Sequence, residues 1–310
     1  MNRLLVIGGQ TAAGKSDLAM ALAKHADIEL ISADSVQIYR GLNVGSAKPN
    51  ADEQSQVRHH LINIRDIAER YSAAEFVCDA DASIADARSR GVLPVVVGGT
   101  GLYIRSLLRG LFEGPPANPE LRAEYAAVME REGGAALHGM LAKVDGATAK
   151  RLHGNDVLRV TRALEVYRLT GEPLSAHLDR HRLAEQRYDA TLVCVTRERP
   201  LLHERINQRC VTMLESGLAA ETHALVEAGA SWAAPGFAAL GYRHIADVAR
   251  GTLPEADLLR TFQTDTRRFA KRQGTFFRGQ LNADWVSVDD EAFDTDAWCV
   301  RTLKDLGGAD

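Results

Sequence analysis

The chain has 310 residues, of which 45% are hydrophobic and 25% are charged, and its formal net charge is -4. This length is typical of one large or two smaller soluble domains, and the net charge does not by itself indicate a nucleic-acid partner, although a local basic patch could still bind phosphates. Four scattered cysteines without a C-x-x-C pair, and no run of about 20 apolar residues, exclude a disulfide framework, a zinc knuckle and a membrane span, so we expect a cytoplasmic protein with buried thiols.

The first predicted element is a buried strand over 4–7, which leads into G-x-x-x-x-G-K-S from Gly9 to Ser16 and then into helical periodicity over 16–24. The glycines permit a tight turn, so the backbone N–H groups of residues 12–16 converge on an anion at a helix N-terminus. Lys15 then reaches the terminal phosphate. The pattern predicts a loop that binds a di- or triphosphate but does not identify the molecule that carries it.

A second strand is predicted over 28–32. Asp34 follows it, in a long loop that ends at Pro49. Ligands of open parallel sheets bind at the carboxyl ends of the strands, so Asp34 lies where a substrate would lie. It could act as a base, bind magnesium, or only cap a turn.

A helix is predicted over 73–90, followed by an interior strand over 93–97 and a glycine-rich turn over 98–101. The glycines let the backbone approach a ligand, and Thr100 offers a hydroxyl at the same sheet edge as the phosphate-binding loop. Tight packing of a strand-to-helix turn is the alternative explanation.

The pattern of alternating strands and helices then stops at a proline-rich segment over 113–119. Residues 121–187 show helical patterns without a convincing strand. The clearest helix is 157–170. Its Arg159 and Arg162 are three apart and share a face, where they could hold a polyanion or remain solvated charges.

Strand character returns over 190–196, and a helix over 201–217 carries Arg205 and Arg209 four residues apart on one face. Six basic residues against one acid lie between Arg260 and Arg278, interleaved with phenylalanines. Such a mixture suits nucleic-acid phosphates and bases, although a helix packing its phenylalanines inward would look similar.

These elements predict an α/β fold: a P-loop NTPase-like parallel sheet flanked by helices, with an inserted all-helical domain. The core domain is expected over 1–113 and 189–310, and the helical insertion over 114–188.

Together these stretches resemble the tRNA dimethylallyltransferases, which attach an isoprenoid to the adenosine on the 3′ side of the anticodon. The resemblance covers nearly the whole chain, through GQTAAGKS, ISADSVQIYRGLNVGSAKP, VGGTGLY, NDVLRVTRALEVYRLTGEPLS, LHERINQR, GYR and AKRQGTFFR. It implies that the loop holds dimethylallyl diphosphate rather than ATP, with magnesium as cofactor and the tRNA anticodon arm as partner. It implies no membrane and no obligate protein partner.

The resemblance also assigns residues. Asp34 matches the base that faces the adenine amine, Thr100 a hydroxyl beside the reacting centre, and Arg205 an arginine at the diphosphate. The positions that match diphosphate binding are Gly9, Gln10, Thr11, Ala12, Ala13, Gly14, Lys15 and Ser16, with Ser16 as the expected magnesium ligand. The positions that match tRNA contacts are Asp34, Ser35, Val36, Gln37, Thr100, Arg122, Leu158, Arg159, Val160, Thr161, Arg162, Gly241, Tyr242, Arg243, Lys271, Arg272, Gln273 and Arg278. The sequence departs from the family at Gln10, where Pro is frequent, and at Val157–Leu158, where Pro-Gln is frequent, so a polar contact at position 158 is not expected.

Three other functions share parts of this pattern. A small-molecule or nucleoside kinase would have the same loop, sheet and acid, but would not need the basic segment. An NTP-driven RNA-binding switch would tolerate loss of Asp34. An adenylate isopentenyltransferase acting on free AMP or ATP would share the chemistry without a grip on the anticodon arm.

Overall fold

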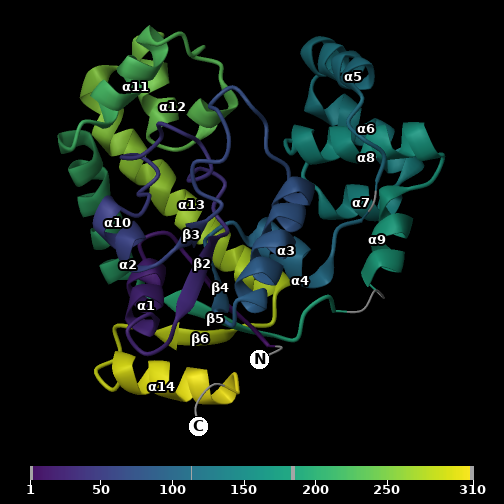
Figure 1. The fold of residues 1–310 in the computed structure, drawn as a ribbon. Helices are drawn as coiled ribbons and strands as arrows, with labels where there is room; N and C mark the ends of the chain where they lie inside the picture. The colour runs from purple at the N-terminus through teal and green to yellow at the C-terminus, as the bar shows by residue number, and fades with distance from the viewer. Residues whose placement is uncertain (1–2, 113, 183–185, 308–310) are drawn as a thin grey trace. The chain divides into compact units, whose positions relative to one another are not determined.

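The computed structural model of the chain describes residues 3–112, 114–182 and 186–307 (Figure 1). The chain divides into two compact units, Met1–Arg109 with Arg187–Asp310 as the core unit, and Gly110–Gln186 as the helical unit. Residue 113, where the first predicted core segment ends, lies outside the described residues, and the predicted domain bounds stay a prediction. Within the described ranges, no helix is long and apolar enough to cross a bilayer.

The core unit is built on one six-stranded sheet in the order β3-β2-β4-β1-β5-β6, and every neighbouring pair is parallel. The strands are β1 Leu4–Gly9, β2 Ile28–Ser32, β3 His59–His60, β4 Leu93–Val97, β5 Ala190–Thr196 and β6 Asp284–Ser287. The predicted parallel sheet is therefore confirmed, as are the strands over 28–32, 93–97 and 190–196. The short edge strands β3 and β6 were missed, because segments of two and four residues carry almost no periodicity.

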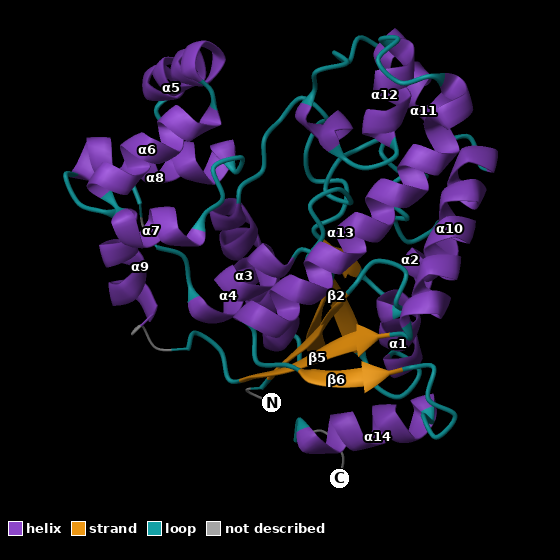
Figure 2. Ribbon diagram, turned by 180° about the vertical axis from the view of Figure 1, so that it is seen from behind, coloured by secondary structure: helices purple, strands orange, loops and turns teal. Residues whose placement is uncertain are grey.

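Helices cover both faces of this sheet (Figure 2). The helices of the core unit are α1 Lys15–Leu22, α2 Ala51–Gln56, α3 Ala73–Ser89, α4 Gly101–Arg109, α10 Arg199–Glu215, α11 Leu218–Glu227, α12 Tyr242–Ala249, α13 Leu258–Gln280 and α14 Thr295–Asp305, with 3-10 turns at Pro235–Ala238 and Glu255–Asp257. Alternate residues of β1 enter opposite hydrophobic clusters, Leu5 and Ile7 on one face and Leu4 and Val6 on the other, as the period of a strand requires.

Helix α13 contributes to both clusters, because Ala270 belongs to the first and Phe277 to the second. Between these two residues the helix passes the edge of the sheet at which β1 ends. The segment predicted from its charge and phenylalanines is thus also a structural element of the core.

The regular structure of the helical unit, within its described residues, is entirely helical (Figure 1). Its helices are α5 Pro119–Glu132, α6 Gly134–Val144, α7 Gly146–Arg151, α8 Val157–Thr170 and α9 Leu174–Arg182. The predicted helix over 157–170 is confirmed: Asp156 caps its first turn, and Gly171 ends it with φ of 73°. The unit has a core of its own, formed around Leu137, Leu141 and Val160.

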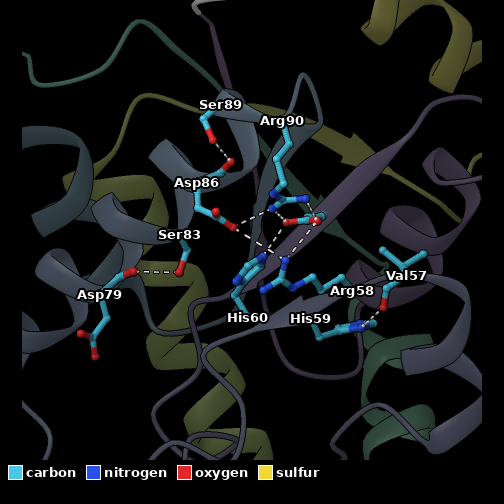
Figure 3. A network of polar contacts seen from close by, with 10 residues as sticks. Val57, Arg58, His59, His60, Asp79, Ser83, Asp86, Ser89 and Arg90 are labelled. Carbon is cyan, nitrogen blue, oxygen red and sulfur yellow. Dashed lines mark hydrogen bonds and ion pairs between the residues drawn. The ribbon is translucent and has the colours of Figure 1, made fainter.

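An ion network around the buried Glu29 connects the edge strand β3 to β2 and α3 (Figure 3). The buried Glu29 accepts two hydrogen bonds of 2.6 Å from Arg90 and lies 2.7 Å from His60 Nε2. Arg90 also bonds Asp86 at 2.7 Å, and Arg58 lies 3.7 Å from both carboxylates. The hydrogen bonds from Arg90 outweigh the effect of burial and lower the pKa of Glu29 to about 2.

Candidate active site

The predicted phosphate-binding loop connects β1 to α1. Gly9 ends the strand with φ of 132°, and a Cβ there would lie 2.4 Å from the carbonyl oxygen of Val195, so no side chain fits. Gly14 adopts φ of 106° immediately before α1 begins at Lys15. Because the first N–H groups of a helix lack partners within the helix, the loop presents donors and a positive dipole end to an anion.

Lys15 and Ser16 follow the loop and line a cavity of about 160 Å³, the first cavity. Lys15 Nζ donates a hydrogen bond of 2.7 Å to the carbonyl of Gln10. Burial and the nearby Arg209 lower the pKa of Lys15 to about 8, while Asp34 opposes this change. The lysine is therefore mostly charged at neutral pH, and an anion beside it would stabilise that charge further.

Asp34 lies in the loop after β2, at the carboxyl edge of the sheet. Its Oδ1 accepts hydrogen bonds from the backbone N–H groups of Val36 and Gln37, at 2.8 and 3.2 Å. No described residue donates to its Oδ2. One oxygen therefore shapes the loop, as in the alternative of a turn cap, and the other remains available for a substrate.

Thr100 is tied to the Asp34 loop through Ser35. Thr100 Oγ1 accepts a hydrogen bond of 3.1 Å from the Ser35 N–H, and the Thr100 N–H donates to the carbonyl of Ala33 at 3.1 Å. A Cβ on Gly98 would lie 2.2 Å from that same Ala33 carbonyl, so the turn and the loop touch backbone to backbone. The structure thus brings Asp34 and Thr100 together.

Arg205 reaches the phosphate-binding loop from α10. Its Nε donates to the carbonyl of Ala12 at 3.1 Å, and its guanidinium lies 3.7 Å from Asp17 on α1. The predicted position of this arginine beside the loop agrees with this geometry, although its role in binding diphosphate stays a prediction.

Two further arginines near the loop were missed as site residues. Arg209, one turn after Arg205, lines the first cavity, and burial lowers its pKa while Asp34 opposes the change. Arg197, directly after β5, donates from Nε to the carbonyl of Ala13 at 3.0 Å and pairs with Asp289. The four-residue spacing could have identified Arg209, and the position after a predicted strand could have identified Arg197.

A second cavity, of about 470 Å³, adjoins the first. It is lined mainly by apolar and aromatic side chains, among them Tyr39, Tyr71, Tyr103, Met213 and Phe262. Both cavities share five lining residues, namely Thr11, Asp34, Ser46, Arg209 and Phe269. Asp34 therefore faces a polar cavity at the loop and an aromatic cavity.

The predicted basic segment forms the second half of α13. Lys271, Arg272 and Arg278 are exposed, and the two arginine guanidinium groups lie 5.9 Å from the Phe269 ring and 4.6 Å from the Trp285 ring, respectively. The helix buries Gln273 and Phe277 on its opposite side. The helix thus packs phenylalanines inward, as the alternative explanation expected, and also has a basic outer face, whose binding to nucleic acid stays a prediction.

The three predicted RNA-contacting residues at the turn before α12, Gly241, Tyr242 and Arg243, differ from one another in their surroundings. The Tyr242 side chain is fully buried, donates to Glu221 at 2.6 Å and accepts from the Gly45 N–H at 2.9 Å. Arg243 lines the second cavity and pairs with Asp265 at 2.5 Å. A contact with RNA from position 242 cannot involve its side chain, because that side chain holds the loop around Gly45.

In the helical unit, Arg122 and Arg162 converge on the buried Glu165. Arg122 donates at 2.9 and 3.1 Å to its two oxygens, and Arg162 donates at 2.5 Å. Burial would raise the pKa of Glu165, but these bonds outweigh it and lower the pKa to about 2. The ion pairs with Glu165 hold both guanidinium groups in place, and its carboxylate neutralises part of their charge.

The remaining predicted RNA contacts of this unit differ in exposure. Leu158 is 85% exposed, Arg159 is exposed and pairs with Asp156, and Thr161 is partly buried. Val160 is completely buried in the core of the unit. Its side chain cannot contact RNA, because the residue faces inward on α8.

Comparisons with known proteins agree with the resemblance seen in the sequence. The model of the family "IPP transferase" matches residues 37–280. A protein of Halorhodospira halophila named tRNA dimethylallyltransferase is 46% identical over 289 residues, which cover 93% of each chain. One from Trichlorobacter lovleyi, named tRNA dimethylallyltransferase 1, is 43% identical over 94% of this chain and 95% of its own.

The solved structures include a full-length tRNA isopentenylpyrophosphate transferase from Bacillus halodurans, which is 35% identical. It superposes with a TM-score of 0.72 and covers 99% of this chain and 96% of that one. Sequence motifs, parallel sheet and near full-length similarity lead to the same conclusion: the chain belongs to the IPP transferase family.

Proposed function

We propose that this protein transfers a dimethylallyl group from dimethylallyl diphosphate to the exocyclic amine of the adenosine 3′ of the tRNA anticodon, releasing diphosphate. Its relatives carry the name tRNA dimethylallyltransferase. The observation that carries the proposal is the position of Asp34, which lines both the cavity of the phosphate-binding lysine and the aromatic cavity. A residue so placed can act on two substrates that enter from different sides.

The first cavity suits the diphosphate. As the bond between the allylic carbon and its oxygen breaks, negative charge grows on the leaving diphosphate, and fixed positive groups stabilise it. Lys15 and Arg209 line this cavity beside the start of α1, and Arg205 bonds the adjoining loop at the Ala12 carbonyl. These groups account for a preference for a diphosphate without any contact to a nucleoside.

Magnesium fits the same cavity. The exposed Ser16 hydroxyl lines the cavity beside Lys15, and Mg²⁺ in phosphate sites takes one or two protein oxygens together with phosphate oxygens and water. When bound there, the ion would neutralise charge on the leaving diphosphate.

The second cavity suits a flipped adenine. Its tyrosine and phenylalanine rings offer stacking partners, and a base inside a stacked anticodon loop can reach such a pocket only when it leaves the stack. The amine nitrogen then bonds to the allylic carbon, and its proton passes to Oδ2 of Asp34. Because Oδ1 is already held by two backbone N–H groups, the base keeps a fixed orientation.

We propose that two surfaces bind the RNA, one in each unit. One is the outer face of α13 with Lys271, Arg272 and Arg278. The other is the arginine pair Arg122 and Arg162 of the helical unit. Phosphate contacts of this kind give affinity and orientation, while the pocket for the flipped base gives specificity.

The proposal is tested by incubating the protein with magnesium, unmodified tRNA and radiolabelled dimethylallyl diphosphate, beside a parallel reaction with labelled ATP. We expect the prenyl label in tRNA, and none with the Lys15→Ala variant, which lacks the charge at the diphosphate. Phosphoryl transfer from ATP without prenyl transfer would identify a kinase instead. Prenylation of free AMP but not of tRNA would identify an adenylate isopentenyltransferase.

A further inference from the structure

We infer that Gln273 is a positioning residue of the reaction, which sets the geometry between the diphosphate loop and the Thr100 turn, rather than a contact to RNA. The inference rests on the proposed function. It changes the role of a residue that lies between the exposed Arg272 and the buried Gly274 on α13.

Both ends of the Gln273 amide are used inside the protein. The side chain is only 7% exposed, its Oε1 accepts a hydrogen bond of 2.8 Å from the Thr11 N–H, and its Nε2 donates one of 2.9 Å to the Gly99 carbonyl. The amide oxygen and nitrogen each bond a backbone group, and the small exposed fraction leaves little of the amide accessible to a nucleotide.

A second glutamine makes the converse contact. Gln10 Nε2 donates a hydrogen bond of 3.0 Å to the carbonyl of Ala270, one turn before Gln273 on α13. The loop therefore reaches the helix through Gln10, and the helix reaches the loop through Gln273. We call this pair the glutamine clamp.

The helix and the glycine-rich turn pack closely. A Cβ on Gly99 would lie 2.4 Å from Gln273 Nε2, and a Cβ on Gly101 would lie 2.4 Å from the Phe276 ring. Helix α13 thus packs on the bare backbone of the turn over 98–101, and small movements of the helix must move the turn or strain it.

The glutamine clamp connects the loop proposed to bind the diphosphate with the turn that lies beside the proposed base. Thr11 belongs to the loop proposed to hold the diphosphate, whereas Gly99 precedes Thr100, which binds the Ser35 N–H beside Asp34. Gln273 bonds both segments. A misplacement of about 1 Å between a reacting carbon and its nucleophile can cost about 100-fold in rate, so the residue that sets this separation matters for turnover.

The same helix carries the proposed RNA grip on its outer face. Lys271 and Arg272 are exposed next to the buried Gln273. The effects of the two faces should therefore separate: the outer residues govern tRNA affinity, and Gln273 governs the rate once both substrates are bound.

The test compares single-turnover prenyl transfer, at saturating tRNA and dimethylallyl diphosphate, in the wild type and in Gln273→Met, which removes both hydrogen bonds at similar volume. We expect the rate to fall about 10- to 100-fold, with unchanged tRNA affinity and unchanged salt dependence of that affinity. The control is Gln263→Met on the same helix, because Gln263 Nε2 donates a comparable bond of 3.2 Å to the Asn207 carbonyl. This control should keep the wild-type rate.

A second variant, Gln273→Glu, separates positioning from mere stability. Its carboxylate still accepts from Thr11 but repels the Gly99 carbonyl, and protonation restores a donor. We expect its rate deficit relative to wild type at each pH to narrow as the pH falls. The inference would be overturned if both Gln273 variants had normal rates, or if Gln263→Met lost as much rate as Gln273→Met. It would also be overturned if the Gln273 variants bound tRNA more weakly, with a smaller salt slope, but had a normal rate at saturation. Absence of prenyl transfer by the wild-type protein would overturn the proposed function itself, and this inference with it.

Discussion

At the scale of single residues, Asp34 combines a structural and a chemical task in one carboxylate. Oδ1 is committed to the backbone of Val36 and Gln37, so the side chain cannot rotate freely. In Asp34→Asn the amide oxygen can keep both bonds, but the group can no longer accept a proton at neutral pH. We expect turnover to fall by roughly 10² to 10⁴, with both substrates still bound, as measured by single-turnover kinetics and a tRNA-binding isotherm.

A turn-capping role alone makes a different prediction for the same variant. It would lower stability by about 1 kcal/mol or less and leave turnover near normal. Near-normal single-turnover rates in Asp34→Asn would therefore exclude the proposed base.

The lowered pKa of Lys15 has a consequence for substrate binding. Burial and Arg209 bring it to about 8, so in the free protein the ammonium loses its proton as the pH rises through that value. Since a neutral amine no longer attracts the diphosphate, kcat/KM for dimethylallyl diphosphate should fall about tenfold per pH unit above about pH 8. Steady-state kinetics from pH 6.5 to 9.5 measure this decline, and a flat profile up to pH 9.5 would contradict it.

At the scale of elements, α13 has one face that packs into the core and one that is exposed and basic. Phe262, Ala270, Gln273 and Phe277 recur at helical spacing and are buried, while Lys271 is among the cations left on the outside. The apolar spacing explains why the helix is part of the core, and the charges explain why its exposed side suits phosphates.

Removal of two outer charges should therefore weaken RNA binding without affecting the diphosphate. In Lys271→Ala/Arg272→Ala, we expect weaker tRNA binding and a salt slope reduced by about 0.7 to 0.9 for each phosphate that the protein no longer neutralises. Filter binding at several salt concentrations measures the slope. Arg260→Ala is the matched control, because Arg260 is exposed on the same helix and pairs with Asp257. A slope that stays unchanged in the double variant would show that these cations are only solvated charges.

At the scale of the whole molecule, the two units have separate cores, and among the described residues each unit includes a buried glutamate that pairs with arginine. Glu29 lies in the core unit and Glu165 in the helical unit. All three tryptophans, Trp232, Trp285 and Trp298, belong to the core unit. Tryptophan fluorescence thus reports on the core unit, whereas far-ultraviolet circular dichroism reports on both.

We expect Glu29→Gln and Glu165→Gln to destabilise different units, each by about 1 to 3 kcal/mol. In the first variant Arg90 keeps Asp86 but loses its buried carboxylate partner, and in the second Arg122 and Arg162 lose the carboxylate that they share. In urea unfolding, Glu29→Gln should shift the fluorescence transition. Glu165→Gln should shift only part of the circular dichroism signal. If both variants shift a single transition equally by both probes, the predicted helical domain does not unfold as a unit of its own.

Local sequence patterns were sufficient to predict much of the secondary structure of this protein. The phosphate-binding loop, the strand over 28–32 and the helix over 157–170 follow from glycine conformation, continuous apolar runs and caps, which act over a few neighbouring residues. The motifs together also indicated the family, since their order and types recur along nearly the whole chain. The roles of Asp34, Thr100 and Arg205 rest on the same resemblance and stay predictions.

Other features depended on contacts between distant segments. Gln273 meets Thr11 across 262 positions of sequence, and Arg197 reaches Ala13 across 184. The burial of Tyr242 likewise follows from its bond to Gly45, on a segment 197 positions away. Such contacts leave no periodicity or spacing in the sequence, because the chain brings them together only when the parallel sheet aligns its strand ends and α13 crosses that edge. The sequence by itself therefore determined the loop, the four longer strands and the family. Only the tertiary structure decided the two short edge strands, the positions of Arg197 and Arg209 beside the loop, and which side chains face inward.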